Sequence, residues 1–209
     1  MAPKLNRLEK VLRTLAETLA RYRVQWALVG GLAVSVRTEP RFTRDVDVAV
    51  AVSSDREAEE LVAALQRAGF RVLEALEQEA VGRLAAVRLQ PPGEPHPGLV
   101  VDLLFASSGI EPELVARAEA LPVFPHVVAA VARLGDLLAL KLLSRDDLTR
   151  PQDAADLRLL LSFATPEDLR IARQAVQDIQ ARGFHRGRDL HKDFNALLEK
   201  HGIPFPLET

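Results

Sequence analysis

The sequence predicts an α+β protein in which a mixed sheet with flanking helices is followed by a C-terminal helical bundle. Residues 45–52 carry valine at every even position and Asp, Asp, Ala and Ala at the odd ones, as in a strand with one buried face. Short apolar runs predict further strands at 24–29, 70–73, 84–89 and 99–105. Apolar residues at helical spacing predict the bundle, with helices over about 134–145, 151–163, 166–181 and 188–201.

The N-terminal part also contains helical patterns. Leucine and valine recur at three- and four-residue spacing up to residue 19, which predicts an amphipathic helix that ends near Arg21. Further helices are expected over 32–37, 55–68 and 112–120, with proline-rich breaks at 91–98 and 122–125. We therefore expect a sheet-containing domain over residues 1–125 and a helical domain over residues 126–209.

The composition is that of an ordinary globular protein. Of the 209 residues, 48% are hydrophobic and 27% are charged, so a packed core is expected over most of the chain. With a net charge of −2, a phosphate-rich partner would need a local basic patch. The absence of cysteine excludes disulfides, thiolate nucleophiles and cysteine zinc sites. We find neither a signal-peptide pattern nor an apolar run of about 18 residues, so we expect a cytoplasmic protein without a membrane span.

Three aspartates are candidate metal ligands. Asp45 and Asp47 lie two residues apart on one strand, so both carboxylates point to the same face. Carboxylate oxygens suit Mg²⁺ or Mn²⁺, and two such ions can activate an attacking hydroxyl and support a leaving pyrophosphate. Asp102 interrupts the apolar strand at 99–105, where a buried carboxylate needs a partner such as a metal. The alternatives are solvated surface acids for the pair and, for Asp102, a strand-end carboxylate that faces solvent or pairs with an arginine.

Gly30-Gly31 is a candidate phosphate-binding turn between a strand and a helix. Glycine lets the backbone approach a phosphate closely, and a helix N-terminus offers unpaired N–H groups. Thr43 begins a Thr-x-Asp-x-Asp pattern about a dozen residues later, and this combination is more specific than Gly-Gly alone. Three nearby arginines are candidates to hold NTP or RNA phosphates, or are solvated loop charges: Arg37, Arg41 and Arg44.

Lys141 is the outstanding residue of the C-terminal part. It is one of five lysines against 22 arginines, and it lies inside the apolar run 137–143. A lysine ammonium suits a phosphate oxygen, although snorkelling to solvent is the commoner fate. Arg145 shares its helix face and could widen a basic patch, and Asp153 and Asp156 share a face of the next helix. A second basic cluster is interpreted as a solvated helix face, with RNA contact as the alternative: His185, Arg186, Arg188, His191 and Lys192.

In their order and spacing these motifs resemble the nucleotidyltransferase superfamily, which has the polymerase-β-like fold. Within it the chain resembles the AbiEii/AbiGii toxins of type IV toxin–antitoxin systems, a group that includes the MenT enzymes. The resemblance covers most of the chain and rests on residues 27–33, 41–48, 101–104, 136–142 and 150–157. The turn is Gly-Gly where much of the superfamily has Gly-Ser, which removes a hydroxyl that can touch phosphate.

The resemblance implies metal-dependent transfer of a nucleoside monophosphate from NTP, in some members to the 3′ end of tRNA. Asp45 and Asp47 would hold Mg²⁺ or Mn²⁺ together with Asp102, Lys141 would hold the triphosphate, and Asp156 would complete the site. The further candidate nucleotide-binding residues are Gly30, Gly31, Thr43, Arg44 and Arg145. Thr43 also matches a position that the antitoxins of some relatives phosphorylate, so a cognate antitoxin is an expected partner.

Two other functions remain open. The first is a nucleotidyltransferase that modifies a protein or a small molecule such as an aminoglycoside. A tRNA acceptor predicts strong salt dependence of the activity, whereas a small acceptor does not. The second is a catalytically silent binding or regulatory module of the same fold, which the intact aspartates and Lys141 argue against.

Overall fold

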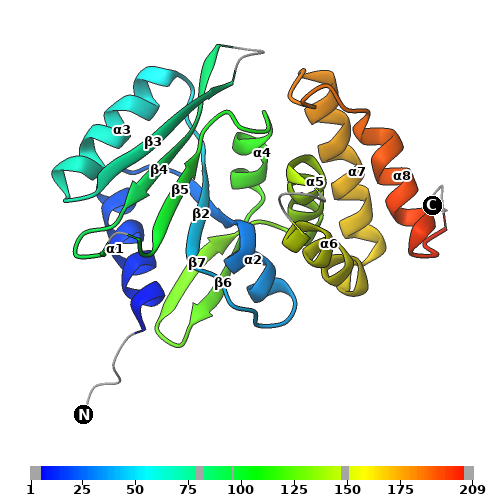
Figure 1. The fold of residues 1–209 in the computed structure, drawn as a ribbon, viewed down its shortest axis with the longest axis horizontal. Helices are drawn as coiled ribbons and strands as arrows, with labels where there is room; N and C mark the ends of the chain where they lie inside the picture. Colours follow the sequence, from blue (N-terminus) through cyan, green and yellow to red (C-terminus); the bar gives the residue numbers. More distant parts are fainter. Residues whose placement is uncertain (1–5, 79–81, 96, 147–150, 205–209) are drawn as a thin grey trace. The chain divides into compact units, whose positions relative to one another are not determined.

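The computed structural model describes residues 6–78, 82–95, 97–146 and 151–204, and within them the chain forms two compact units (Figure 1). The first unit comprises residues 1–107 and 111–132, and the second comprises residues 108–110 and 133–209. All seven strands of the described chain lie in the first unit, and the helices of the bundle lie in the second. The predicted fold class, a mixed sheet with helices followed by a helical bundle, is confirmed.

The first unit contains one mixed sheet of seven strands in the order β3-β4-β5-β2-β1-β7-β6. Two pairs of neighbours are parallel, β2 with β5 and β1 with β7, and the other pairs are antiparallel. The strands are β1 Trp26–Val29, β2 Asp45–Val50, β3 Arg71–Gln78, β4 Arg83–Gln90, β5 Val100–Leu104, β6 Glu119–Phe124 and β7 Val127–Val131. The helices of this unit are α1 Arg7–Arg21, α2 Gly30–Arg37, α3 Asp55–Arg67 and α4 Glu111–Ala116.

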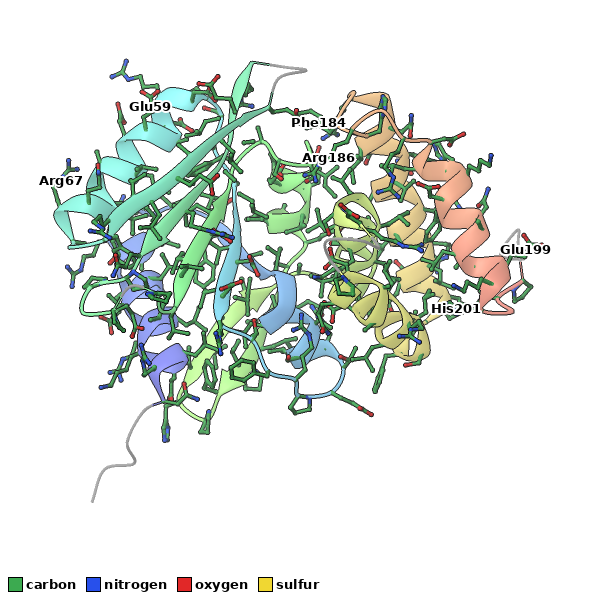
Figure 2. All side chains as sticks on the ribbon, in the orientation of Figure 1. Glu59, Arg67, Phe184, Arg186, Glu199 and His201 are labelled. Carbon is green, nitrogen blue, oxygen red and sulfur yellow. The ribbon has the colours of Figure 1, made fainter. Side chains whose placement is uncertain are left out.

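Strand β2 lies at the centre of the sheet and carries the predicted alternation. Val46, Val48 and Val50 are completely buried, whereas the side chains of Asp45 and Asp47 are only partly buried. Helix α1 packs against β2 and β7, and α3 packs against β4. The outer surface of α3 is polar, as Glu59 and Arg67 illustrate (Figure 2). The buried valines therefore fix the register of β2 and leave its two aspartates on the less buried face.

The segment 119–131 differs from the prediction. A helix was expected up to residue 120 and an irregular break over 122–125, but the helix ends at Ala116 and residues 119–131 form the antiparallel hairpin β6–β7. Pro122 lies inside β6, and β6 is an edge strand that tolerates a residue without an N–H donor. Because β7 belongs to the sheet, the division between the two units falls after Ala132, whereas the domain boundary was expected at residue 125.

The second unit is built from four helices: α5 Leu134–Ser144, α6 Pro151–Phe163, α7 Pro166–Ala181 and α8 Leu190–Lys200. Helix α5 packs against the other three, and the short segment 108–110 joins this unit. Phe184, which is buried, lies against Gly109, where a side-chain carbon would come within 2.5 Å of its ring (Figure 2). Over the described residues, no helix has the length and apolarity that crossing a membrane requires.

Arg188 differs from the prediction for the basic cluster at 185–192. The cluster was interpreted as a solvated helix face, but the Arg188 side chain is bonded within the second unit. Its guanidinium donates hydrogen bonds to the carbonyls of Leu142 and Leu143, at 2.9 and 3.3 Å, and to the Asp193 carboxylate at 2.6 Å. These carbonyls belong to the last turn of α5, where no backbone N–H is available within the helix. Arg188 therefore caps the C-terminus of α5.

Candidate active site

The three candidate carboxylates lie on one face of two neighbouring strands. Asp45 and Asp47 are two residues apart on β2, and in the parallel β2–β5 pair Asp47 stands directly opposite Asp102. Residues opposite each other on adjacent strands share a face of the sheet, so the three side chains project to the same side. The sequence predicted all three as metal ligands, and the register of β2 with β5 places Asp102 opposite Asp47.

Asp102 forms an ion pair with an arginine that sequence reasoning did not single out. Arg88 of β4 stands opposite Asp102 and donates from Nε to Oδ1 at 2.8 Å and from Nη2 to Oδ2 at 2.7 Å. The pKa of Arg88 is raised by these hydrogen bonds and the Asp102 charge, against the effect of burial. The apolar run 84–89 predicted a strand that contains Arg88, but only the register of β4 with β5 brings Arg88 to Asp102.

The electrostatic environment of Asp45 is unfavourable to its charge. Burial raises the pKa of Asp45, and the negative charge of Asp102 raises it further, while Arg88 and Arg44 lower it. A carboxyl whose pKa is higher in the folded than in the unfolded protein adds stability at low pH, and that stability is lost as the pH rises through the folded-state pKa. At neutral pH the ionised Asp45 therefore costs stability.

We expect Asp45→Asn to stabilise the protein in metal-free buffer. At pH 7 with EDTA the melting temperature should rise by about 2 °C, because the amide removes the buried charge without changing the shape. The gain should shrink as the pH is lowered, since the native carboxyl then becomes neutral as well. Differential scanning fluorimetry across pH measures both effects. Asp178→Asn, in a partly exposed carboxylate on α7 that accepts a hydrogen bond from Gln174, is the control and should change little at any pH. A fall in melting temperature for Asp45→Asn would contradict this account.

Gly30 makes room for the Asp47 carboxylate. Gly30 begins α2 with a φ of +62°, and a side-chain carbon there would lie 1.9 Å from Oδ2 of Asp47. Gly31 is similarly crowded, because a side-chain carbon there would lie 2.4 Å from Nη2 of Arg41 and 3.1 Å from Oγ1 of Thr43. The helix was expected from residue 32, and its earlier start brings the uncapped N-terminus of α2 next to β2. The two glycines thus let the backbone pack against the site.

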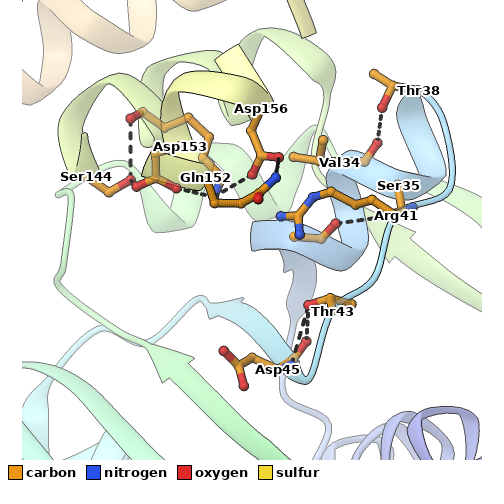
Figure 3. Close-up of polar contacts among 12 residues, drawn as sticks. Val34, Ser35, Thr38, Arg41, Thr43, Asp45, Ser144, Gln152, Asp153 and Asp156 are labelled. Carbon is orange, nitrogen blue, oxygen red and sulfur yellow. Dashed lines mark hydrogen bonds and ion pairs between the residues drawn. The ribbon is translucent and has the colours of Figure 1, made fainter. Parts of the chain in front are cut away.

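The loop that precedes β2 presents an aromatic and a cationic side chain. The hydroxyl of Thr43 lies 3.5 Å from the backbone nitrogen of Asp45 (Figure 3). Phe42 is 78% exposed, and the guanidinium of Arg44 lies 5.4 Å from the centre of its ring. A groove of about 880 Å³ runs along this loop, and its lining includes Arg41, Phe42, Thr43, Arg44, Leu99 and Phe124. Arg37 does not join the groove lining, because it bonds the carbonyls of Val131 and Ala132 and the carboxylate of Glu119.

Lys141 in the second unit lies in a buried ion-pair network. Its ammonium is 2.6 Å from Oδ1 of Asp153 and 2.9 Å from Oδ2 of Asp156, and the three side chains are 13%, 7% and 1% exposed. Ser144 donates to the other oxygen of Asp153, and Gln152 donates to Asp156 (Figure 3). Lys141 therefore does not snorkel to solvent. Asp153 and Asp156 were expected to share a helix face, and the structure adds that both pair with Lys141.

Loss of Lys141 should destabilise the second unit. Lys141→Met would leave two buried carboxylates without their cation, which we expect to lower the free energy of unfolding by about 3 kcal/mol. Urea unfolding followed by circular dichroism measures the change. Lys192→Met removes an exposed lysine from α8 and should change the stability by less than about 0.5 kcal/mol. Adding Asp153→Asn to Lys141→Met should recover part of the loss, and the absence of any recovery would argue against the electrostatic explanation.

The predicted site residues therefore fall into two groups, one in each unit. The first unit carries Asp45, Asp47, Asp102, Gly30, Gly31, Thr43 and Arg44, and the second carries Lys141, Asp156 and Arg145. Arg145 follows the last residue of α5, and its carbonyl accepts a hydrogen bond from Arg188. Arg150, part of the C-terminal motif, lies outside the described residues. Arg88, Asp153 and Phe42 are the additions that the structure makes to the candidate set.

Comparisons with known proteins agree with the geometry. The family model described as "Nucleotidyl transferase AbiEii toxin, Type IV TA system" matches residues 13–206. No curated protein matches the chain in sequence. The solution structure of the antibiotic-resistance factor ANT(2″)-Ia is similar with a TM-score of 0.56 at 16% identity, covering 85% of this chain and 95% of that one. An antigenic nucleotidyltransferase-like protein from Paracoccidioides brasiliensis gives a TM-score of 0.50 at 21% identity, over 90% and 91% of the two chains.

These structural likenesses bear on the fold alone, and they confirm the polymerase-β-like nucleotidyltransferase fold that the motifs led us to expect. The family match covers nearly the whole chain and confirms the predicted family. The chain is therefore a nucleotidyltransferase and belongs to the AbiEii toxin family of type IV toxin–antitoxin systems.

Proposed function

We propose that the protein transfers a nucleoside monophosphate from NTP to the 3′ end of tRNA in the cytoplasm, using Mg²⁺ or Mn²⁺, and that a cognate antitoxin restrains it. The observation that carries this proposal is the arrangement of Asp45, Asp47 and Asp102 on one face of β2 and β5, with Gly30 packed against Asp47. In such a transfer an acceptor hydroxyl loses its proton and bonds to the α-phosphorus, while the bond to pyrophosphate breaks.

The chemistry of the carboxylates fits a divalent cation. All the candidate ligands are oxygens, which Mg²⁺ and Mn²⁺ prefer. The repulsion between Asp45 and Asp102 would be relieved by a cation beside them. A bound ion would activate the attacking hydroxyl and stabilise the departing pyrophosphate. Over the described residues no three acidic or histidine side chains are already gathered as a metal cluster, and Asp102 is bonded to Arg88. Asp45 and Asp47, to which the family resemblance assigns the metal, would be the primary ligands.

Other residues would bind the triphosphate. Helix α2 has no side-chain cap, so its N-terminal N–H groups, beginning at Gly30 and Gly31, can donate to phosphate oxygens. Thr43 and the exposed Arg44 would add donors from the loop before β2. The family resemblance assigns the triphosphate also to Lys141, with Asp156 completing the site. Arg145, which follows α5, would widen the basic patch around Lys141. The ion pairs with Asp153 and Asp156 use two of the three N–H donors of Lys141 among the described residues, which leaves one for a phosphate oxygen.

The groove beside β2 favours a nucleic-acid acceptor over a cationic small molecule. Phe42 is an exposed aromatic ring of the kind on which nucleobases stack, and Arg44 beside it suits phosphate. An aminoglycoside carries several positive charges, and the exposed Arg44 on the groove lining would repel them. The same charge distribution suits the phosphate backbone of RNA.

The decisive experiment is an incubation of the purified protein with Mg²⁺, total tRNA and each labelled NTP in turn. Label in the tRNA that is lost on chelation and falls steeply with added salt would support the proposal. Label on the protein itself or on a small molecule would support nucleotidyl transfer but would contradict tRNA as the acceptor. No transfer from any NTP, together with no Mg²⁺-dependent binding of NTP, would leave only the silent binding module.

Phe42→Ala should weaken binding of the acceptor but not of NTP. Loss of one stacked base is expected to raise the KM for tRNA by about tenfold, because base–aromatic stacking contributes about 1–3 kcal/mol. Initial rates at varied tRNA and at varied NTP separate the two KM values. Phe163→Ala removes another exposed phenylalanine, 45% accessible at the end of α6, and should leave both values unchanged. Equal changes in the two KM values would argue against an acceptor role for Phe42.

A further inference from the structure

The ion pair between Arg88 and Asp102 involves one of the three proposed metal ligands. The guanidinium holds both carboxylate oxygens, at 2.8 and 2.7 Å, in the two-pronged geometry that fixes a carboxylate most firmly. Asp102 is at the same time the residue opposite Asp47, on the face where the metal ligands are proposed. A divalent ion beside these oxygens would repel the guanidinium and draw on the same carboxylate charge, so the two cations would compete for Asp102.

The two partners differ in burial, and this decides which of them would move. The Asp102 side chain is 15% exposed, whereas that of Arg88 is 45% exposed. Asp102 is also held on β5 between β4 and the central strand β2, so its position is set by the sheet. The long arginine side chain can turn away into solvent, while the short aspartate cannot leave the site.

A second carboxylate, that of Glu74, lies on the neighbouring strand on the other side of Arg88. Glu74 of β3 lies opposite Arg88 in the antiparallel β3–β4 pair, and its side chain is exposed. Asp102, Arg88 and Glu74 therefore follow one another across three adjacent strands on one face of the sheet. A guanidinium released by Asp102 would meet Glu74 within the reach of cross-strand neighbours, so its charge would keep a partner.

We infer that Arg88 competes with the divalent metal for Asp102, so that this carboxylate changes partner when the metal binds. The inference rests on the proposed metal-dependent function. In the metal-free protein Arg88 holds Asp102 in position and offsets its charge. When a cation binds at Asp45 and Asp47, Asp102 becomes available as a third ligand only after Arg88 withdraws toward Glu74. Arg88 is thus a positioning residue that weakens metal binding and keeps the empty site stable.

The competition is tested by measuring Mn²⁺ binding to the full chain by electron paramagnetic resonance, without NTP. Arg88→Met should tighten Mn²⁺ binding by about fivefold to tenfold, because the competing charged hydrogen bonds are lost. The same substitution in an Asp102→Asn background should give no gain. Arg83→Met is the control. Arg83 is another arginine of β4, but it pairs with Asp55, at 3.2 Å, and not with any of the three carboxylates, so its loss should leave the Mn²⁺ affinity unchanged.

Thermal stability gives an independent readout. In EDTA, Arg88→Met should lower the melting temperature, because Asp102 has lost its counter-charge. Saturating Mn²⁺ should then raise the melting temperature of Arg88→Met by more than it raises that of the native protein. A purely structural role predicts the same deficit with and without Mn²⁺. If Arg88→Met does not fold, Arg88→Lys takes its place, because lysine keeps the charge but not the two-pronged geometry. Its Mn²⁺ binding should be tighter than that of the native protein, by less than the gain expected for Arg88→Met.

The outcomes separate this inference from the proposed function. Unchanged or weaker Mn²⁺ binding by Arg88→Met, or by Arg88→Lys if only that variant folds, in a protein that transfers nucleotides overturns the competition and leaves the function intact. A gain that persists in the Asp102→Asn background also overturns it, because the effect then does not pass through Asp102. Absence of Mn²⁺ binding in every variant, with no transfer, overturns both.

Discussion

Replacement of Asp47 by asparagine is expected to lower the rate of nucleotidyl transfer by about 10³-fold, because a charged metal ligand at the reacting phosphate is lost. Asp47 is the central member of the three carboxylates, since it shares β2 with Asp45 and stands opposite Asp102. The asparagine keeps the size of the side chain, so Gly30 and β1 should pack against it as before. Circular dichroism and the melting temperature should therefore remain close to those of the native protein.

The measurement is the initial rate of label transfer at saturating NTP and Mg²⁺, with Asp178→Asn as a control for the loss of one carboxylate elsewhere. That control is a partly exposed residue of α7 outside the candidate site and should retain full activity. The loss in Asp47→Asn should appear in kcat and persist at high Mg²⁺. Recovery of the native rate at high Mg²⁺ would mean that Asp47 only attracts the ion, and an unchanged rate would remove it from the site.

Much of the fold could be predicted from the spacing of apolar residues, because that spacing shows which face of a strand or helix is buried. The alternation over 45–52 identified β2, and the observed strand buries its valines as the pattern requires. The helical spacing after residue 134 likewise identified the four helices of the second unit. The β6–β7 hairpin was missed because Pro122 and Pro125 resemble helix and strand breakers. Proline is harmless on an edge strand, but a sequence does not say which strand will be the edge.

The candidate site shows where prediction from sequence ends. Asp45 and Asp47 could be paired from their spacing, since the geometry of a single strand relates them. Joining Asp102 to Asp47 needs the order of the strands, and joining Arg88 to Asp102 needs the register of β4. Asp153 could be placed on one helix face with Asp156, but an acid in the first turn of a helix is ordinary until its partner, here Lys141, is known. The metal and nucleotide roles of these residues remain predictions.

The second large effect is expected at Gly30, where backbone and carboxylate are in closest contact. An alanine there would place its side-chain carbon 1.9 Å from Oδ2 of Asp47, so the carboxylate must move or the strand must shift. The φ of +62° adds the cost of a left-handed conformation, about 1 kcal/mol for a residue with a side chain. We expect Gly30→Ala to destabilise the first unit by about 2–4 kcal/mol and to reduce transfer by about 100-fold or more.

Gly82→Ala separates the clash from the backbone cost. Gly82 has nearly the same φ, +59°, but no described atom lies within 4 Å of the position that its side-chain carbon would take. It should therefore lose about 1 kcal/mol of stability and keep its activity. If Gly30→Ala and Gly82→Ala lose equal stability and both remain active, Gly30 serves only the turn into α2. A selective loss of activity in Gly30→Ala would mean that the Asp47 carboxylate must sit against the α2 N-terminus for transfer to occur, because the substitution changes no ionisable group.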